Sequence, residues 1–415
     1  MGLTCRHSLV FIPSFNPYSI HDESMISSTT TTSNRLSLEH NEGLDIFIAA
    51  GEASGDLHGA HLVKAIHEQS PHCRVFGLGG SALAVQGAEL IVRNDDIAVT
   101  GIIEVASHFR AIRAGFHRLL QEAGRRRPAL AILIDYPDFN LRLAAKLKRL
   151  GIPIMYYISP QLWAWRRGRI RTIKRHVDHM VVILPFEAKL YADAGIPVTF
   201  VGHPLKETVH PSMTREEFFA AIDRHPDRPL VTLLPGSRRK EVVHHLPVLA
   251  SAVTLLKRPI ELLIAKAPTV DRALIESLAP GIRILEDGIY DALAYSDVVA
   301  TSCGTATLET ALSGTPMITF YRLSRLTYFL GRPLVRMKTF AMCNILAGRR
   351  IVPELIQENF TPERVASELE KLLAGDRVRQ EMRAGLAEIR EQLGPPGAAS
   401  RAAAIALGLA GHDGK

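Results

Sequence analysis

The sequence predicts an α/β fold made of two doubly wound, Rossmann-like domains that face each other across a cleft. The chain has 415 residues, whereas single domains usually have about 100–200. Short apolar runs alternate with amphipathic stretches, as expected for a mostly parallel sheet with helices on both faces. This pattern starts again after the segment Pro204–Pro229, so we expect two such sheets.

The composition is that of a globular protein, with 47% hydrophobic and 22% charged residues, and it excludes global disorder and collagen-like structure. No apolar run approaches the roughly 18 residues that a membrane-spanning helix needs, so we expect none. The net charge of +7 allows nucleic acid, phosphorylated metabolites or an anionic membrane as partners without choosing among them. The four cysteines form no CxxC motif, so we expect neither a disulfide framework nor a zinc site.

Residues 1–43 differ from the rest of the chain. They contain the unbroken Ser/Thr tract Ser27–Ser33 and show no periodic apolar face, which predicts a disordered tail. A translation start at or near Met25 is an alternative explanation for this segment. A transit peptide is another, although Asp22 and Glu23 disfavour it.

The first domain is predicted at residues 44–205, because apolar runs of strand length recur there. The predicted strands are Asp45–Ala50, Arg74–Leu78, Ala129–Ile134, Ile154–Ile158, Met180–Leu184 and Val198–Val201. The predicted helices are Gly55–His67, Phe109–Ala123 and Leu141–Leu150. This alternation favours parallel pairing of the strands.

The second domain is predicted at residues 206–375, followed by a helical segment at 376–415 that includes the alanine-rich stretch Ala398–Ala410. The predicted strands are Leu230–Leu234, Ile260–Ala265, Ile282–Leu285, Val298–Thr301 and Met317–Tyr321. In open α/β sheets, ligands bind beyond the carboxyl ends of the strands. A cleft between two such domains is therefore the expected site.

The first glycine-rich loop, Ala50–Gly59, follows a predicted strand and opens a predicted helix. Glycines permit a tight turn, and a helix N-terminus offers free N–H groups to an anion. The candidate cleft residues here are Gly51, Glu52, Ser54 and Gly55. A plain turn with Ser54 or Asp56 as the helix cap explains the same pattern.

The second loop contains Gly236 and Ser237, followed by three cations that begin with Arg238 at a predicted helix start. Cations at this end oppose the helix dipole, so they need another reason to be there. A bound diphosphate supplies that reason. The alternative is a solvated basic turn.

The third loop, Thr301–Glu309, runs from a strand through small residues into a helix. The backbone amides from Gly304 to Ala306, Thr305 included, are candidates for holding phosphate oxygens. Glu309, about one turn into the helix, is a candidate for the hydroxyls of a ribose. An ordinary turn with Glu309 on the surface is the alternative.

Asp135 and Asp138 follow a wholly apolar predicted strand, so both are expected at the edge of the sheet that faces the cleft. A carboxylate at that place can remove a proton from a hydroxyl nucleophile. Asp138 is interpreted as a helix N-cap, which leaves Asp135 as the candidate general base.

Two basic stretches contain aromatic residues and no acid, Trp163–His176 and Tyr321–Arg350. Cations beside aromatic side chains suit an anionic bilayer, single-stranded nucleic acid or a dimer contact. A solvated face with buried tryptophans is the alternative. The candidates for a membrane or acceptor surface are Trp163, Trp165, Arg166 and Arg167.

No metal site is expected, because the chain has neither a D-x-D nor an HExxH motif. His58 and His61 lie three residues apart on one predicted helix, as do His176 and His179. Neither pair has a third ligand in view. We therefore interpret these histidines as structural or exposed.

Taken together, these segments resemble the lipid-A-disaccharide synthase family. Members of this family are two-domain lipid glycosyltransferases of the GT-B type. The resemblance covers about Asp45–Ala374 and is carried by nine ordered motifs. These are AGEASGD at 50–56, VTGIIEV at 99–105, IDYPDFN at 134–140, YYISPQLWAWR at 156–166, LPFE at 184–187, VGHPL at 201–205, LLPGSR at 233–238, SCGTATLE at 302–309 and NILAGR at 344–349. The tail departs from the family pattern.

The resemblance implies transfer of 2,3-diacylglucosamine from its UDP donor to the 6-hydroxyl of 2,3-diacylglucosamine 1-phosphate (lipid X). It places UDP on the second domain, with Gly236, Ser237 and Arg238 at the diphosphate. Thr305, Ala306 and Glu309 complete the nucleotide site, and Asn344 lies near the cleft. The acceptor falls to the first domain, near Asp135 and the Trp163–Arg175 segment.

The resemblance also implies a cytoplasmic enzyme, peripheral on the inner face of the bacterial inner membrane. It implies no cofactor, no metal and no nucleic acid partner, and it allows a homodimer. Two other hypotheses stay open at this point. One is a related GT-B enzyme, such as a UDP-N-acetylglucosamine epimerase or another lipid glycosyltransferase, and the other is a nucleotide-binding regulator without turnover.

Overall fold

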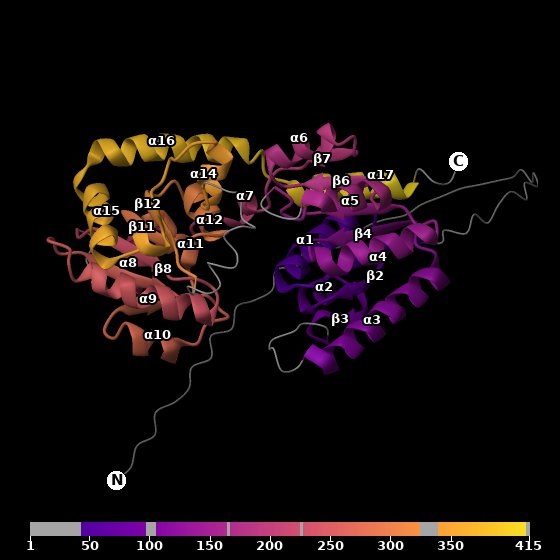
Figure 1. Ribbon diagram of the computed structural model, residues 1–415, viewed down its shortest axis with the longest axis horizontal. Coiled ribbons are helices and arrows are strands. Elements are labelled where there is room, and N and C mark those ends of the chain that lie inside the picture. The colour runs from indigo at the N-terminus through magenta and orange to yellow at the C-terminus, as the bar shows by residue number, and fades with distance from the viewer. Residues whose placement is uncertain (1–42, 97–104, 164–166, 225–226, 324–338, 412–415) are drawn as a thin grey trace, which may run out of the picture. The chain divides into compact units, whose positions relative to one another are not determined.

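The computed structural model (Figure 1) describes residues 43–96, 105–163, 167–224, 227–323 and 339–411. Apart from Gly43, the predicted disordered tail therefore lies outside the described residues. Within this part of the chain, the α/β prediction is confirmed, because the strands form two parallel sheets with helices between them.

The first sheet has seven parallel strands in the order β3-β2-β1-β4-β5-β6-β7. Its strands are β1 (Asp45–Ala50), β2 (Arg74–Gly79), β3 (Glu89–Arg93), β4 (Leu130–Ile134), β5 (Ile154–Tyr157), β6 (His179–Val182) and β7 (Val198–Phe200). The helices between them are α1 (Ala53–Gln69), α2 (Ser81–Val85), α3 (Val105–Arg126), α4 (Pro137–Arg149), α5 (Ile170–His176) and α6 (Pro185–Asp193). The order reverses between β1 and β4, as in a Rossmann fold.

The strands of this sheet are apolar throughout because both faces are covered. In β1, Ile46 and Ile48 belong to one buried cluster, whereas Phe47 and Ala49 belong to another. Helices α1 and α17 (Ala398–Gly411) cover the face that carries Ile46 and Ile48. Helices α3, α4 and α5 pack on one another over the face that carries Phe47 and Ala49. Alternate residues of one run thus fill two separate cores.

The second sheet has six parallel strands in the order β10-β9-β8-β11-β12-β13, with the same reversal between β8 and β11. Its strands are β8 (Leu230–Leu234), β9 (Glu261–Ala265), β10 (Arg283–Leu285), β11 (Val298–Ser302), β12 (Met317–Tyr321) and β13 (Glu354–Ile356). Its helices are α7 (Leu205–Thr208), α8 (Arg215–Ala221), α9 (Arg239–Val253), α10 (Arg272–Leu278), α11 (Ile289–Tyr295), α12 (Ala306–Ser313), α14 (Met342–Ala347), α15 (Pro362–Ala374) and α16 (Asp376–Gln392).

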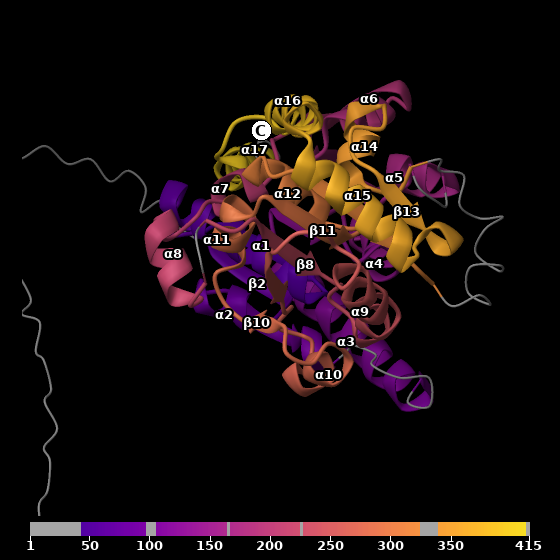
Figure 2. The same cartoon turned by 90° about the vertical axis from the view of Figure 1, so that its left-hand side faces the viewer.

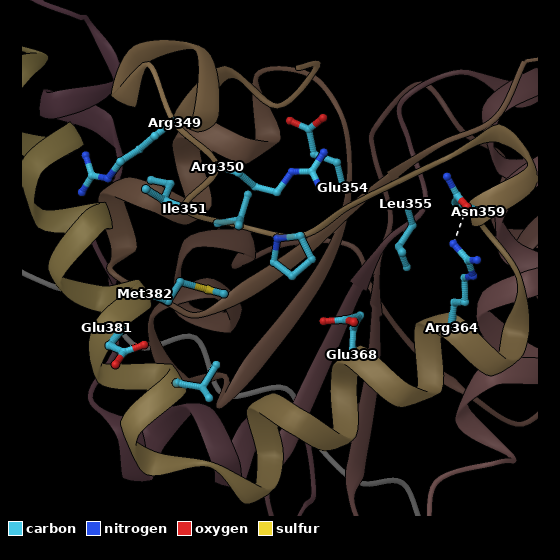
Figure 3. A pocket seen from close by; sticks show the side chains of 13 residues that line it. Arg349, Arg350, Ile351, Glu354, Leu355, Asn359, Arg364, Glu368, Glu381 and Met382 are labelled. Carbon is cyan, nitrogen blue, oxygen red and sulfur yellow. Dashed lines mark hydrogen bonds between the residues drawn. The ribbon is translucent and has the colours of Figure 1, made fainter. Parts of the chain in front are cut away.

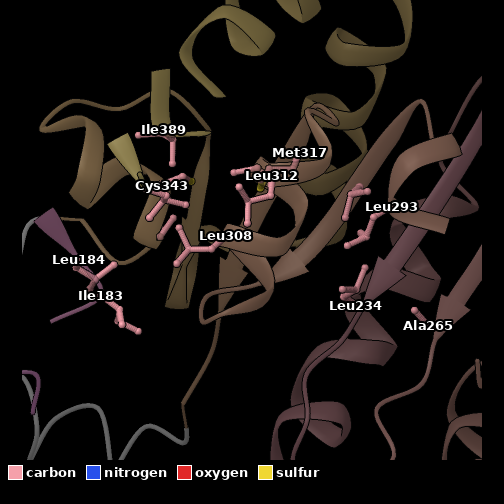
Figure 4. Packing of buried hydrophobic residues seen from close by; sticks show 14 of the residues in the cluster. Ile183, Leu184, Leu234, Ala265, Leu293, Leu308, Leu312, Met317, Cys343 and Ile389 are labelled. Atoms are coloured by element: carbon pink, nitrogen blue, oxygen red, sulfur yellow. The ribbon is translucent and has the colours of Figure 1, made fainter. Parts of the chain in front are cut away.

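Two groups of helices cover this sheet. Helix α9 packs against α10 and α15, while α12, α14 and α16 pack against one another; Figure 2 shows both groups from a second side. Leu308, Leu312, Cys343 and Ile389 are buried in the core of the second group (Figure 4). The chain then returns to the first sheet, because α17 packs on α1 and β4.

The structure corrects several predicted element bounds. Strands β3 and β13 were not predicted, and both lie at the outer edge of a sheet. Helix α4 begins at Pro137 rather than at Leu141, because proline fits the first helical position. The expected strand over Met180–Leu184 is instead His179–Val182, and helix α6 begins at Pro185.

The expectations for cysteines and membrane spans can be compared within the same ranges. Cys73, Cys303 and Cys343 are free thiols. Among the helices that the structure describes, none has both the length and the apolar character needed to cross a bilayer.

Candidate functional site

Each sheet has a switch point, where its strand order reverses. At each switch point, two of the predicted loops lie side by side. At the reversal of the first sheet, Ala50 at the end of β1 pairs with Ile134 at the end of β4. At the reversal of the second sheet, Leu234 of β8 pairs with Thr301 of β11. The first glycine loop is therefore adjacent to Asp135, and the second glycine loop is adjacent to the third, at the edges where such folds bind ligands.

At the first switch point, close packing requires a glycine at position 51. A Cβ atom on Gly51 would lie 2.1 Å from Cδ1 of the Tyr136 ring, so only glycine fits under this side chain. Tyr136 also stacks on Phe139, with ring centroids 5.5 Å apart. Gly51 thus supports the turn that follows β4.

The backbone at Asp135 is held in an uncommon conformation. Asp135 has φ 43° and Tyr136 has φ 45°, a left-handed region that few non-glycine residues occupy. Three hydrogen bonds oppose this strain: the N–H of Asp135 donates to the Tyr157 carbonyl (3.2 Å), and its own carbonyl accepts from Tyr156 Oη (2.6 Å) and Asn140 Nδ2 (2.8 Å). The turn is fixed by the core, so the position of the Asp135 side chain is fixed as well.

The Asp135 carboxyl is tuned toward neutral pH. Burial is the largest cause and the charge of Glu52 is the second; together they raise its pKa to about 6, against the opposing hydrogen bond from the Tyr136 N–H. A general base works best when its pKa lies close to the operating pH. The carboxyl is therefore suited to accept a proton.

The helix-capping interpretations in this region were wrong. Tyr136 occupies the N-cap of α4, and Asp138 is instead the second helical residue, where it pairs with Arg169. Glu52 is the N-cap residue of α1 without a side-chain cap, so neither Ser54 nor Asp56 has that role. Asp56 accepts from the N–H groups of Gly80, Ala82 and Leu83 and so caps the neighbouring helix α2.

The second loop offers an arginine rather than free amides. Gly236 has φ 130°, which suits glycine alone. The N–H groups of Ser237 and Arg238 both donate to Oε2 of Glu241, at 3.0 and 3.3 Å. The Arg238 side chain pairs with Glu241 Oε1 at 3.6 Å yet remains 80% exposed, so its guanidinium can still meet an anion. Arg239 and Lys240 are exposed as well.

The third loop does present free amides. Gly304 has φ 157°, and Thr305 is the N-cap residue of α12, which starts at Ala306. Within the described ranges, the N–H groups of these three residues have no hydrogen-bond partner. This N-terminus is suited to an anion.

Glu309 faces α11, where Tyr290 Oη donates to its Oε1 (3.3 Å). Burial raises the pKa of Glu309.

The basic-aromatic segment divides into two parts. Trp165 and Arg166 lie outside the described residues, and so does the side chain of Arg167. Trp163 is half-buried: its Nε1 donates to Glu187 Oε1 (3.2 Å), and its ring meets Phe186 edge-on at 5.4 Å. Trp163 is therefore part of a packed wall rather than an exposed anchor.

These loops line one cavity of about 700 Å³, which we call the loop cavity. Its predicted members are Glu52, Ser54, Gly55, Asp135 and Trp163 from the first half and Arg238 and Thr305 from the second. Within the described residues, the lining from the first half contains three acids and no lysine or arginine. The lining from the second half contains Arg238 and the third-loop residues Cys303, Gly304 and Thr305. One wall thus favours hydroxyl groups and the other favours phosphate.

Three titratable lining residues of the first half were not predicted as site residues: His58, His203 and Glu187. Burial lowers the pKa of each histidine to about 4, so both are neutral at pH 7. Glu187 belongs to the LPFE motif, and the presence of a carboxyl in an otherwise apolar turn was the available signal.

Asn344 has a structural role instead of the predicted one at the cleft. Its side chain is 1% exposed. Nδ2 donates to the Val352 carbonyl (3.0 Å) and to Glu354 Oε1 (2.8 Å), and Oδ1 accepts from the N–H groups of Ile351 (2.7 Å) and Val352 (3.0 Å). An amide can make two donations and two acceptances, so nothing is left to bind a nucleotide.

Asn344→Ala is therefore expected to lower stability rather than nucleotide affinity. The change leaves buried groups of Val352 without partners, and we expect the free energy of unfolding to fall by about 2–5 kcal/mol. Denaturant titration measures this. The control Asn359→Ala removes an exposed amide that pairs with Arg364 and should change stability by less than about 0.5 kcal/mol. Unchanged stability in Asn344→Ala would contradict the assignment.

A second cavity, of about 660 Å³, lies between β13 and the helices α15 and α16 (Figure 3). Its charges are mixed, because Arg349, Arg350 and Arg364 line it together with Glu354, Glu368 and Glu381. Arg349 also pairs with Glu388 at 2.8 Å. None of the glycine loops lines this cavity, and we assign no ligand to it.

The described residues contain no group of three or more His, Cys, Asp or Glu side chains that could hold a metal ion.

Comparison with known sequences gives one consistent result. A family model described as Lipid-A-disaccharide synthetase matches residues 46–407. The lipid-A-disaccharide synthase of Syntrophus aciditrophicus is 46% identical over 372 residues, which is 88% of this chain and 97% of that protein. That of Myxococcus xanthus is 43% identical over 371 residues, with the same coverage.

Comparison with solved structures identifies the fold. CalG4, the calicheamicin glycosyltransferase, superposes with a TM-score of 0.57 at 16% identity, covering 90% of this chain and all of that one. MurG of Acinetobacter baumannii gives 0.53 at 15%, and UDP-GlcNAc 2-epimerase of Neisseria meningitidis gives 0.59 at 12%, each covering 88% of this chain and 99% of the other. At these identities the likeness shows the architecture alone.

Proposed function

The chain belongs to the lipid-A-disaccharide synthetase family, and on that premise we propose that the loop cavity is where this enzyme joins two acylated glucosamines. It is a GT-B glycosyltransferase of lipid A biosynthesis. The donor is UDP-2,3-diacylglucosamine and the acceptor is 2,3-diacylglucosamine 1-phosphate. The products are the disaccharide 1-phosphate and UDP.

One observation carries the assignment of sites: the opposite character of the two walls of the loop cavity. Arg238 and the free amides after Gly304 suit the diphosphate of the donor. Asp135 and Glu52 repel an anion and suit a sugar hydroxyl. We therefore assign UDP to the second half and the acceptor sugar to the first.

In the proposed reaction, Asp135 takes the proton from the 6-hydroxyl of the acceptor. The oxygen of that hydroxyl forms a bond to the anomeric carbon while the bond from that carbon to the UDP oxygen breaks. The electron pair leaves with UDP, whose negative charge Arg238 and the α12 N-terminus stabilise. A single displacement inverts the anomeric centre, and UDP leaves without needing a proton.

Omission of one substrate tests the reaction class. The protein should release UDP only when donor and acceptor are both present. Turnover of the donor alone to a free sugar would favour an epimerase, and tight UDP binding without turnover would favour a regulator.

We further propose that the enzyme attaches to an anionic membrane surface through its α4–α5 face, as a peripheral protein. Arg149 on α4 and Arg171 and Arg175 on α5 are exposed there. Burial is the first cause of the lowered pKa of His176, and the charges of Arg175 and Arg149 add to it. These charges support attraction to anionic lipid.

Pelleting with anionic vesicles should therefore fall as the salt concentration rises, because salt screens surface charges. Each arginine near such a surface contributes about 1 kcal/mol, so Arg171→Glu should weaken binding by about fivefold or more. Arg377→Glu is the matched control, since Arg377 is 91% exposed on α16 and should leave pelleting unchanged. Binding that does not respond to salt, or equal losses in the two variants, would contradict this surface.

A further inference from the structure

Glu187 is a buried carboxyl in the wall of the loop cavity that the proposed reaction does not use. It lies in the first turn of α6 and is 2% exposed. Its Oε1 accepts the indole N–H of Trp163 at 3.2 Å. Its Oε2 is buried and has no hydrogen-bond partner among the described residues, although the residue lines the cavity.

The groups around Glu187 make the charged form of its carboxyl unfavourable. Asp135 faces it from the end of β4, and Ser159 and Trp163 face it from the segment after β5. Tyr191 lies one turn further along α6 and hydrogen-bonds Ser159 (2.7 Å). None of these four carries a positive charge, and the described lining from the first half offers no lysine or arginine.

Burial is the largest cause of the raised pKa of Glu187, which reaches about 8 despite the hydrogen bond from Trp163. The charge of Asp135 raises it further. Glu187 is therefore a neutral acid at pH 7, so its carboxyl carries a proton.

We propose that Glu187 is a second acceptor-binding carboxyl, which uses Oε2–H to donate a hydrogen bond to a hydroxyl or amide oxygen of the acylated acceptor sugar beside Asp135. This rests on the proposed function, because it places the acceptor against the same wall. Phosphate is disfavoured as the group bound there, since Glu52 and Asp135 line that wall as well. A neutral acid can donate such a bond without adding a charge beside the base.

Substitution and pH separate this role from a structural one. Glu187→Gln keeps an acceptor for Trp163 and a donor in place of Oε2–H, so the KM for the acceptor should stay within about twofold of wild type at pH 7. Glu187→Leu should raise that KM by about tenfold, as expected for the loss of one buried hydrogen bond. The KM for the donor should not change in either variant.

The pH dependence is the sharper test. Glu187 stays protonated below its pKa of about 8, so the wild-type KM for the acceptor should rise as pH passes through about 8. In Glu187→Gln, which cannot ionise, this rise should be absent. The same rise in both proteins, or a wild-type KM in Glu187→Leu with normal melting, would overturn the proposal. Absence of disaccharide synthesis by the wild type would instead overturn the proposed function.

Discussion

Asp135→Asn is expected to lower turnover by about 100- to 10,000-fold, the usual contribution of a positioned base. Asparagine preserves the size of the side chain but cannot accept the proton of the acceptor hydroxyl. The strained turn that holds this side chain depends on backbone hydrogen bonds, so it should survive the change. Steady-state rates, with UDP affinity measured in parallel, should show lost turnover and nearly unchanged UDP binding.

The matched control is Asp138→Asn, because Asp138 lies three residues away and pairs with Arg169 instead of lining the loop cavity. It should cost far less activity. If Asp138→Asn were inactive and Asp135→Asn active, the general base would have been assigned to the wrong carboxyl. If both variants keep full activity, the base is another residue.

Asp135→Asn should also stabilise the protein at neutral pH. The folded-state pKa of about 6 lies above the ordinary 3.8, so folding favours the protonated form. The contribution of Asp135 to the free energy of unfolding is fully present below about pH 4 and is lost as the pH rises through about 6. By linkage, the free energy of unfolding is therefore about 3 kcal/mol lower above this range than below it. The variant should therefore melt higher than wild type at pH 7. The wild-type rate should fall as pH drops through about 6.

Arg238→Ala is expected to lower turnover by about 100-fold or more, as for the loss of one charge-stabilising donor. Its side chain pairs with Glu241 at 3.6 Å but stays exposed and lines the loop cavity, whereas the amides of this loop are paired with Glu241. Lys240→Ala is the control, since Lys240 is also exposed on α9 but does not line the cavity. Similar losses in the two variants would show that net charge, rather than this position, is what matters.

A chelator should leave the rate unchanged if Arg238 and the α12 N-terminus neutralise the departing UDP. Strict dependence on added magnesium would contradict this account of the leaving group.

The central strands of both sheets were predictable, because strands buried on two faces read as unbroken apolar runs. The missed strands β3 and β13 are edge strands. Glu354–Ile356 has only three residues and begins with an acid, so nothing in its local pattern distinguishes it from a loop. Its strand conformation is imposed by pairing with β12.

The site was predictable where function follows from chain order, as for the loops after the four switch-point strands. It was not predictable where the function of a residue depends on which groups elsewhere lack partners. Asn344 and Glu187 are both buried polar residues in recognisable motifs. The hydrogen bonds of Asn344 are complete, whereas Oε2 of Glu187 has no partner within the described part of the chain. Only the folded chain shows that difference.

The most direct test is the structure of the product. The purified protein, UDP-2,3-diacylglucosamine and 2,3-diacylglucosamine 1-phosphate are incubated together, and the lipid product is analysed by mass spectrometry and NMR. The account predicts one UDP released per disaccharide, with a β-1,6 link and the large H1–H2 coupling of an inverted centre. An α-linked disaccharide would contradict the single displacement assisted by Asp135, and the absence of any disaccharide would contradict the assigned function.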